Sequence, residues 1–273
     1  MTPLPITRAA VWGASGFIGS ALCAAAQARG WMVQHLPRSG ANTAALAGID
    51  LAYHCAGKAV ETDPGGYVEA AERFAHACAA ARVKRLIYLG TVAVYGSKFS
   101  GAIDTGAPLA GTGAYAESRI RAERALQATL AQSTTRLSIV RVPTILGHGM
   151  PGTVVARFAR AIDWGVFLHP GPADATLACL GVRRLAEILV RIGELRSPPP
   201  IAQFSDHLRW TDIAGRVGKL RGRRILRVPL PALGGKLAVL GSTARYRDDV
   251  VELFGQEAGL PATAEDLDAA LKP

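Results

Sequence analysis

Short apolar runs alternate with longer amphipathic segments along the first half of the chain. The apolar runs are too short for helices, whereas the segments between them have helical length and periodicity. The predicted strands are Ala9–Trp12, Met32–Leu36, Leu51–Cys55, Arg85–Gly90 and Leu137–Val142, and the predicted helices are Phe17–Arg29, Tyr67–Arg82 and Tyr115–Leu130. Strands that alternate with helices of this length indicate an α/β protein with a doubly wound parallel sheet.

The second half of the chain is less regular and predicts a smaller lobe. Its helical segments are short and interleaved with turns, and a break falls at Ser197–Pro200. We expect residues 1–150 to form the main α/β domain and residues 151–273 a small mixed α/β substrate lobe, interleaved with the first domain. The helices predicted there are Thr153–Trp164, Val182–Ile192, Thr211–Lys219 and Arg247–Phe254.

A glycine-rich segment, GASGFIG, joins the first predicted strand to the first predicted helix. Gly13 permits a tight turn, Gly16 lets the backbone approach a pyrophosphate, and Gly19 lets the helix pack closely on the strand. The helix N-terminus presents N–H groups to the phosphates. These features predict a Rossmann fold that binds a nicotinamide dinucleotide through Gly13, Ser15, Gly16, Phe17, Ile18 and Gly19.

The residues after the second strand bear on which dinucleotide is bound. An NAD enzyme normally places an acidic residue there to bind the ribose 2′-hydroxyl. This chain has Pro37, Arg38 and Ser39 instead. A guanidinium beside a hydroxyl suits a 2′-phosphate, so we predict NADP(H), with Arg38 and Ser39 at the phosphate. NAD(H) is the alternative, in which Arg38 is an ordinary surface arginine.

Composition narrows the classes of partner. The formal charge is +10, and the densest basic run is KLRGRRILR, Lys219–Arg227. Because no aromatic interleaving or zinc-ligand spacing accompanies that run, we expect no nucleic-acid partner. The four cysteines have no metal-site spacing, which favours reduced, structural thiols in a cytoplasmic protein, with no metal site. No run of 18 apolar residues occurs, so no membrane span is predicted.

Four segments together resemble the extended short-chain dehydrogenase/reductase family, which includes nucleotide-sugar epimerases, dehydratases and dihydroflavonol-type reductases. Besides GASGFIG, they are DLAYHCAG at Asp50–Gly57, VKRLIYLGTVAVYG at Val83–Gly96, and RVP with ILG at residues 141–147. The resemblance implies that Ala56 lines the adenosine side of the cofactor. It also implies that Thr91 is the catalytic hydroxyl and that Pro143 lies beside the nicotinamide.

The family's catalytic pair is Tyr-x-x-x-Lys, and this chain reads Tyr115-Ala-Glu-Ser-Arg119. Residues four apart share one face of a helix, so Arg119 is expected beside Tyr115. In the family the lysine holds the nicotinamide ribose and supports the tyrosine by its charge. Arginine keeps that charge but is larger, and its donors form a planar fork. We therefore expect Thr91, Tyr115 and Arg119 to be catalytic, with Tyr115 and Arg119 also contacting the cofactor.

A second departure from the family lies between the second and third strands. The family usually places an extra strand there, with an aspartate that contacts adenine. Only about a dozen residues separate Arg38 from Leu51, and none before Asp50 is an aspartate. We expect an adenine pocket that is shorter or more open than in the family.

These assignments predict an NADP(H)-dependent oxidoreductase that reduces a carbonyl, or oxidises an alcohol, of a small metabolite. Tyr115 would act as general acid and Thr91 would polarise the substrate oxygen. A nucleotide-sugar epimerase or dehydratase with retained cofactor is the first alternative, disfavoured by the short chain. A non-catalytic NADP(H)-binding sensor or scaffold is the second. The resemblance also implies a homodimer through the helices at 67–82 and 115–130.

Other polar residues in these segments have plainer interpretations. We expect His54 to be a packed or hydrogen-bonded core histidine, and His148 and His169 to be loop residues that could touch substrate. Glu117 and Glu123 are expected to pair with neighbouring arginines.

Overall fold

The computed structural model describes residues 6–39, 42–57, 63–96, 101–150, 166–170, 175–220, 222, 226–230, 245–254 and 260–271. The chain forms two compact units, each assembled from separate stretches of sequence. Unit 1 comprises Met1–Gly96, Pro108–Val142 and Leu185–Gln203. Unit 2 comprises Ser97–Ala107, Pro143–Arg184 and Phe204–Pro273.

Unit 1 is built on a six-stranded parallel sheet in the order β10-β6-β4-β3-β1-β2. Its strands are β1 (Arg8–Trp12), β2 (Met32–Leu36), β3 (Leu51–His54), β4 (Arg85–Thr91), β6 (Arg136–Val142) and β10 (Ile201–Gln203). The first five match the five predicted strands to within one residue at each end. The doubly wound α/β fold is thereby confirmed. β10 has only three residues, too few for a recognisable alternation.

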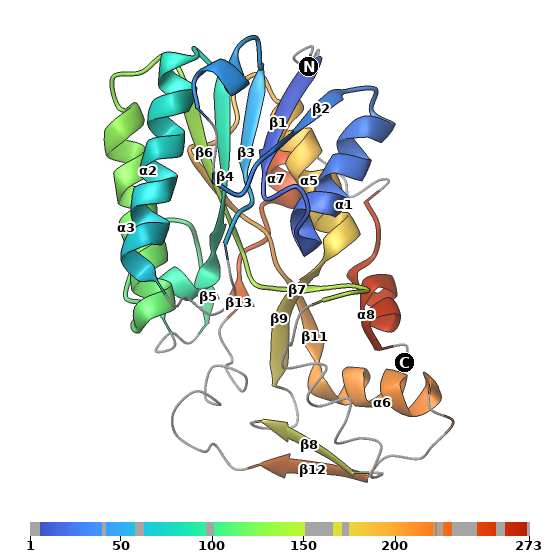
Figure 1. The fold of residues 1–273 in the computed structure, drawn as a ribbon. Coiled ribbons are helices and arrows are strands. Elements are labelled where there is room, and N and C mark those ends of the chain that lie inside the picture. The colour runs from blue at the N-terminus through green and yellow to red at the C-terminus, as the bar shows by residue number, and fades with distance from the viewer. Residues whose placement is uncertain are drawn as a thin grey trace. The chain divides into compact units, whose positions relative to one another are not determined.

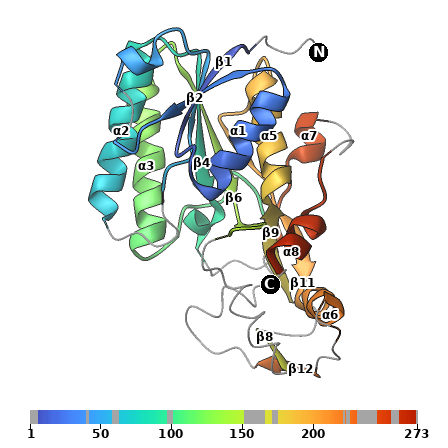
Figure 2. The same ribbon diagram turned by 45° about the vertical axis from the view of Figure 1, so that its right-hand side comes forward.

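Helices cover both faces of this sheet (Figures 1 and 2). α2 (Pro64–Ala80) and α3 (Ala114–Leu130) lie side by side on one face, and α1 (Phe17–Ala28) and α5 (Val182–Glu194) lie on the other. The alternation of side chains along β3 explains this arrangement. Ala52 packs into the core under α2 and α3, whereas the Tyr53 hydroxyl donates to the Leu189 carbonyl of α5 at 2.9 Å.

α2 begins three residues before its predicted start at Tyr67. Asp63 is the N-cap, and its carboxylate accepts a hydrogen bond from the Gly66 N–H at 2.9 Å. Pro64 occupies the first helical turn, where a missing N–H costs nothing. The segment Pro-Gly-Gly looks like a loop in the sequence, but the cap converts it into the first turn of the helix.

β2 lies at the edge of the sheet. Among the described residues between β2 and β3, the regular structure is a single 3₁₀ turn, η1 (Ala44–Leu46), which is consistent with the predicted absence of an extra strand. The chain runs from β1 to β2 on one side and then to β3 on the other. The order therefore reverses between β1 and β3, and ligands of such sheets bind outside the carboxyl ends of the strands at this point.

Among its described residues, unit 2 holds three small sheets and three short helices. Its larger sheet has the order β11-β9-β7, and Trp210, Leu177 and Leu267 are buried in its core. Neither α8 nor the short strands of unit 2 were predicted from the sequence. The predicted helix Thr153–Trp164 lies outside the described residues. The elements are β5 (Ala102–Ile103), β7 (Thr144–Leu146), β8 (Val166–Pro170), β9 (Thr176–Gly181), β11 (Asp206–Arg209), α6 (Trp210–Leu220), β12 (Leu226–Leu230), β13 (Arg245–Tyr246), α7 (Val250–Phe254) and α8 (Thr263–Leu271).

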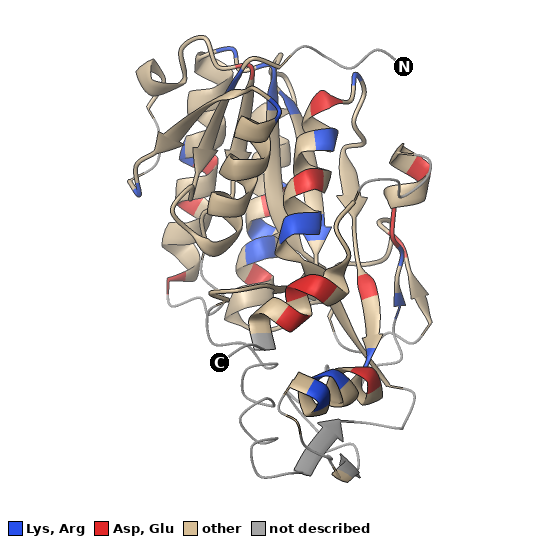
Figure 3. Ribbon diagram, turned by 90° about the vertical axis from the view of Figure 1, so that its right-hand side faces the viewer, with Lys and Arg blue, Asp and Glu red and all other residues tan. Residues whose placement is uncertain are grey.

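Charged residues of both signs are interspersed on the helices of the molecule (Figure 3). Arg29 pairs with Glu187 and Glu194 at 2.9 Å each, and Arg216 pairs with Asp268 at 2.8 Å. Several arginines thus have local acidic partners. Much of the basic run at Lys219–Arg227 lies outside the described residues. Within the described part of the chain, no helix combines the length and apolarity that a bilayer span requires.

Candidate functional site

The glycine-rich loop connects β1 to α1 at the point where the strand order reverses. Gly13 has φ +92°, which favours glycine, and the Gly16 N–H donates to its carbonyl at 2.9 Å. A Cβ on Gly13 would lie 2.7 Å from the backbone nitrogen of Ala56, just after β3. A Cβ on Gly19 would collide with the Gly13 carbonyl oxygen. The loop therefore closes only with glycine at both positions, which brings the ends of β1 and β3 together.

The first turn of α1 is open to an anion. Its N-cap, Gly16, makes no side-chain capping bond, and no acidic residue lies in the turn. Ser15 and Gly16 are exposed, while Phe17 and Ile18 are half-buried. A helix N-terminus with uncapped N–H groups and a partial positive charge binds phosphate. This cradle, whose close backbone contacts require glycine at positions 13 and 19, fits a dinucleotide pyrophosphate, and the Ala56 backbone lies against Gly13.

The residues after β2 present a positive charge. Arg38 and Ser39 are both exposed, and the Trp12 indole N–H donates to the Arg38 carbonyl at 3.4 Å. The first acidic residue after β2 is Asp50. Its carboxylate accepts hydrogen bonds from the backbone of Thr7 and from Lys84 Nζ at 2.7 Å. Asp50 is therefore already engaged elsewhere and is not the acidic residue that would bind a ribose 2′-hydroxyl.

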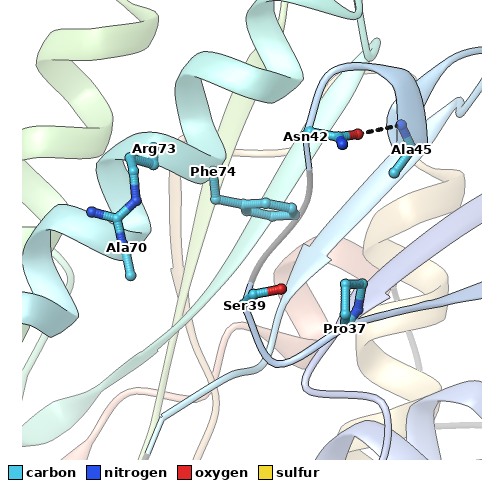
Figure 4. A pocket seen from close by; sticks show the side chains of 7 residues that line it. All are labelled: Pro37, Ser39, Asn42, Ala45, Ala70, Arg73 and Phe74. Atoms are coloured by element: carbon cyan, nitrogen blue, oxygen red, sulfur yellow. Dashed lines mark hydrogen bonds between the residues drawn. The ribbon is translucent and has the colours of Figure 1, made fainter.

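A pocket of about 310 Å³ opens beside Ser39. Figure 4 shows Phe74 of α2 pointing toward Pro37 and Ser39, with Asn42 opposite. The Asn42 side-chain oxygen accepts a hydrogen bond from the Ala45 N–H at 2.9 Å and so holds the short loop in place. The pocket lies next to the segment that follows the edge strand β2. Its lining residues are Pro37, Ser39, Asn42, Ala45, Ala70, Arg73 and Phe74.

Thr91 and Tyr115 lie on neighbouring elements of unit 1. Thr91 is the last residue of β4, and its hydroxyl oxygen accepts a hydrogen bond from the Ala93 N–H at 3.2 Å. Tyr115 is half-buried in the first turn of α3. The Gly111 N–H donates to the Val94 carbonyl at 2.8 Å, which ties the approach to α3 to the turn after β4. The structure thus brings the two predicted elements together.

Arg119 is buried beside Tyr115, with only 4% of its surface exposed. Its guanidinium carbon lies 4.6 Å from the centroid of the Tyr115 ring. It lies closer still, at 3.5 Å, to the ring of Tyr67 in α2, a residue that the sequence analysis did not single out. The expected pairing of Tyr115 and Arg119 on one helix face is therefore observed, with a second aromatic ring added from another helix.

A buried ionic network begins at Glu123, one helical turn after Arg119 in α3. Glu123 of α3 accepts two hydrogen bonds from Arg141 of β6, the shorter at 2.7 Å. Arg141 also donates to the Tyr95 hydroxyl at 2.9 Å, which in turn donates to Gln203 at 2.8 Å. Burial raises the pKa of Glu123, and Arg141 opposes this shift. Glu123 does pair with an arginine, as predicted, but the partner comes from β6. Arg141 therefore has a structural role here.

His54 is buried among four aromatic side chains. Its ring centroid lies 4.5 Å from that of Trp12 and 5.1 Å from that of Tyr88. Neither imidazole nitrogen has a hydrogen-bond partner among the described residues. Burial, with a smaller contribution from the charge of Arg119, lowers the pKa of His54 to about 3. His54 is therefore a packed, uncharged core histidine, one of its two predicted roles.

The remaining candidates are divided between the two units. Glu117 accepts a hydrogen bond from the Gly113 N–H at 2.9 Å and so caps the start of α3, where an arginine partner was predicted. Pro143 is half-buried directly after β6, and His148 is exposed. The side chain of His169 is not among the described parts of the structure. All four cysteines are free thiols, and burial raises the pKa of Cys55 and Cys78 to about 12.

Solved structures of similar fold cover nearly the whole chain. An NAD-dependent NDP-hexosamine 5,6-dehydratase of tunicamycin biosynthesis matches at 19% identity and TM-score 0.76, over 97% of this chain and 96% of that one. MoeE5, in complex with UDP-glucuronic acid and NAD, matches at 19% and 0.77, over 97% of each chain. A UDP-glucuronic acid 4-epimerase from Bacillus cereus, in complex with UDP-glucuronic acid and NAD, matches at 17% and 0.77, over 97% and 98%. At these identities, the matches establish the fold.

The family is established by a separate comparison. No curated protein matches this chain. However, the model of the NAD dependent epimerase/dehydratase family matches residues 9–172, which is more than half of the sequence. This stretch contains the glycine-rich loop, the end of β4 and the Tyr-x-x-x-Arg segment. The chain therefore belongs to the NAD-dependent epimerase/dehydratase family, within the extended short-chain dehydrogenases/reductases.

Proposed function

We propose that this chain is a nicotinamide-dinucleotide-dependent oxidoreductase acting at a carbonyl or carbinol carbon. The observation that carries the proposal is the buried Arg119 guanidinium next to Tyr115, in the same unit as the phosphate cradle. A tyrosine hydroxyl within reach of the substrate oxygen can donate and accept the proton that the reaction moves. The cradle at Gly13–Gly19 would hold the pyrophosphate, and Ala56 of the same unit would flank the rest of the dinucleotide.

Each residue of the site has a defined task in this reaction. When bound, the dinucleotide supplies or accepts the hydride. Tyr115 donates its hydroxyl proton to the substrate oxygen during reduction and removes it during oxidation. Because the Thr91 oxygen accepts from the Ala93 N–H, its own O–H can donate to the same substrate oxygen. Arg119 contacts the nicotinamide ribose and holds the Tyr115 ring by a cation–π contact.

Replacing Tyr115 with phenylalanine is expected to lower kcat by about 100-fold or more, because general acid–base catalysis contributes that much. The dinucleotide Kd should change by less than about threefold, since only one contact is lost. Activity would be followed by NADPH or NADH absorbance over a panel of ketones and aldehydes. Thr91→Val should give a smaller loss of kcat. If Tyr115→Phe retained full activity on a confirmed substrate, the catalytic assignment would be wrong.

For the cofactor we propose NADP(H). Arg38 and Ser39 are exposed immediately after β2, and Asp50 is engaged with Lys84 and the first strand. The described residues 37–39 and 42–49 contain no acidic side chain that could bind a ribose 2′-hydroxyl. The pocket beside Ser39 offers room for the adenosine portion. Two solved structures of similar fold are complexes with NAD, and NAD(H) is the alternative cofactor for this chain.

Replacing Arg38 with glutamine is expected to weaken NADP⁺ binding by about tenfold or more, because a charge-assisted pair with the 2′-phosphate is lost. NAD⁺ binding should change by less than about threefold. Calorimetric titration with both dinucleotides measures the two Kd values. Arg136→Gln is the matched control, since Arg136 is an exposed arginine at the opposite, amino end of β6. Tighter binding of NAD⁺ than NADP⁺ by the unmodified chain would refute the NADP(H) proposal.

A nucleotide-sugar epimerase or dehydratase is the second candidate. The short chain does not disfavour it, because this chain covers 96–98% of three solved structures whose names include such enzymes or a bound nucleotide sugar. An epimerase or dehydratase reoxidises its own cofactor and retains it. Dinucleotide that co-purifies with the protein, with no net NAD(P)H turnover, would favour this candidate over the reductase. If the chain instead bound dinucleotide without turnover of any substrate, it would be a sensor or scaffold.

A further inference from the structure

The guanidinium of Arg119 lies close to two aromatic rings from different helices. Its central carbon lies 3.5 Å from the centroid of the Tyr67 ring in α2 and 4.6 Å from that of Tyr115 in α3. Both distances are within the range of a cation–π interaction, and burial of Arg119 strengthens such contacts. The shorter contact is with the ring outside the Tyr-x-x-x-Arg motif.

The Tyr67 ring is itself held in place from two sides. Its hydroxyl is hydrogen-bonded to the hydroxyl of Tyr88 in β4 at 2.9 Å, and Tyr88 is fully buried. On the other side lies Gly57, just after β3. A Cβ there would lie 3.1 Å from Arg119 Nη2 and 3.3 Å from Tyr67 Cε2. Gly57 is exposed, and the end of the guanidinium therefore lies close to the surface of unit 1 at this residue.

This surrounding is suited to arginine and poorly suited to lysine. A guanidinium is planar, delocalised and weakly hydrated, so it stacks on aromatic rings even when buried. An ammonium is a compact, strongly hydrated charge whose burial favours loss of the proton. Lysine at position 119 would also lack the flat group that fills the space between the two rings. The substitution of arginine for the family's lysine is thus matched by a compensating residue, Tyr67.

We propose that Tyr67 is a positioning residue that holds Arg119 against Tyr115. The Tyr67–Arg119–Tyr115 stack does in this chain what a lysine does in relatives with Tyr-x-x-x-Lys. The proposal rests on the proposed function, because it takes Arg119 to contact the nicotinamide ribose. The expected effect of restoring the family's lysine is therefore the opposite of what the family resemblance alone predicts. Restoring the family's lysine by Arg119→Lys should weaken dinucleotide binding in this chain.

The test is a double-mutant cycle on the full chain. Kd values for NADP⁺ and NAD⁺ would be measured calorimetrically for Tyr67→Leu, Arg119→Lys, the double variant and Tyr67→Phe. We expect Tyr67→Leu and Arg119→Lys each to weaken binding of the preferred dinucleotide about thirtyfold, the size of a desolvated cation–π contact. The double variant should be no weaker than either single variant. Tyr67→Phe keeps the ring and should stay within about threefold of the unmodified protein.

A second readout does not depend on the cofactor. The Arg119 side-chain NMR signals, assigned by their absence in Arg119→Lys, should be shifted upfield by ring currents in the unmodified chain and in Tyr67→Phe. In Tyr67→Leu they should move part of the way back to ordinary positions, because the Tyr115 ring remains at 4.6 Å, with thermal unfolding showing that this variant is folded. If Tyr67→Leu bound the dinucleotide as tightly as the unmodified chain, or if the two losses were additive, the positioning role would be wrong.

Two further outcomes separate this inference from the proposed function. If Arg119→Lys tightened dinucleotide binding, the stack would be dispensable and the inference would fail while the proposed function stood. If the unmodified chain bound neither dinucleotide, the proposed function would fail, and the positioning role would fail with it.

Discussion

Replacing Gly19 with alanine is expected to weaken dinucleotide binding by at least about 100-fold and to lower the free energy of unfolding by about 2 kcal/mol. Helix propensity alone predicts the opposite sign, because alanine is favoured over glycine in a helix by about 1 kcal/mol. However, a Cβ at this position would lie 2.7 Å from the Gly13 carbonyl carbon, besides colliding with its oxygen. To remove this clash, α1 must move away from the loop, and this movement misaligns the N–H groups of the cradle.

Gly65→Ala is the matched control for this prediction. Gly65 also lies in the first turn of a helix, but the nearest atom to an added Cβ is Asp63 Oδ1 at 3.9 Å. That variant should bind the dinucleotide normally and be at least as stable as the unmodified chain. Calorimetric titration and chemical denaturation measure the two quantities. Unchanged binding in Gly19→Ala would show that the close approach of α1 to the loop does not create the cradle.

Stability should fall on mild acidification because of His54. The folded-state pKa of His54, about 3, lies below the unfolded value of 6.5, so between these values only the unfolded chain takes up the proton. Unfolding is therefore favoured as the pH falls through this window. From about pH 7 to about pH 5, we expect this residue to reduce the free energy of unfolding by about 2 kcal/mol. The loss should be complete only near the folded-state pKa.

His54→Leu should remove this acid sensitivity. Leucine has a similar volume and no titrating nitrogen, and it replaces an imidazole whose two nitrogens lack partners among the described residues. At neutral pH the variant should be at least as stable as the unmodified chain. Urea denaturation at several pH values compares the slopes, with His76→Leu, an exposed histidine of α2, as control. Equal slopes for His54→Leu and the unmodified chain would contradict the assignment.

The sheet of unit 1 was largely predictable from local patterns. Its strands are bounded by glycine and proline and consist of short apolar runs, so their positions follow from periodicity. The start of α2 was misplaced because the Asp63 cap acts through the side chain of a residue outside the helix. The short strands β10 and β11 were missed because three or four residues carry no recognisable alternation, and their pairing partners supply the structure.

Some residues of the candidate site were also predictable from local patterns, and others were not. Gly13, Gly19, Arg38, Thr91, Tyr115 and Arg119 stand at motif spacings that can be recognised in one dimension. Tyr67 carries no such signal, since it precedes Arg119 by about fifty residues on a different helix. The partnership of Glu123 with Arg141 likewise joins α3 to β6. In both cases the contact depends on how helices pack on the sheet, which local spacing does not encode.

By itself, the sequence determined that this protein is a parallel α/β protein with a dinucleotide loop and a Tyr-x-x-x-Arg pair, because each of these depends on residues close together along the chain. Only the tertiary structure decided that Arg119 is stacked on Tyr67, that Asp50 is engaged away from the cofactor edge, and that His54 is buried without a polar partner. Those outcomes depend on burial and on contacts between distant segments, and these determine where a charge can be stabilised.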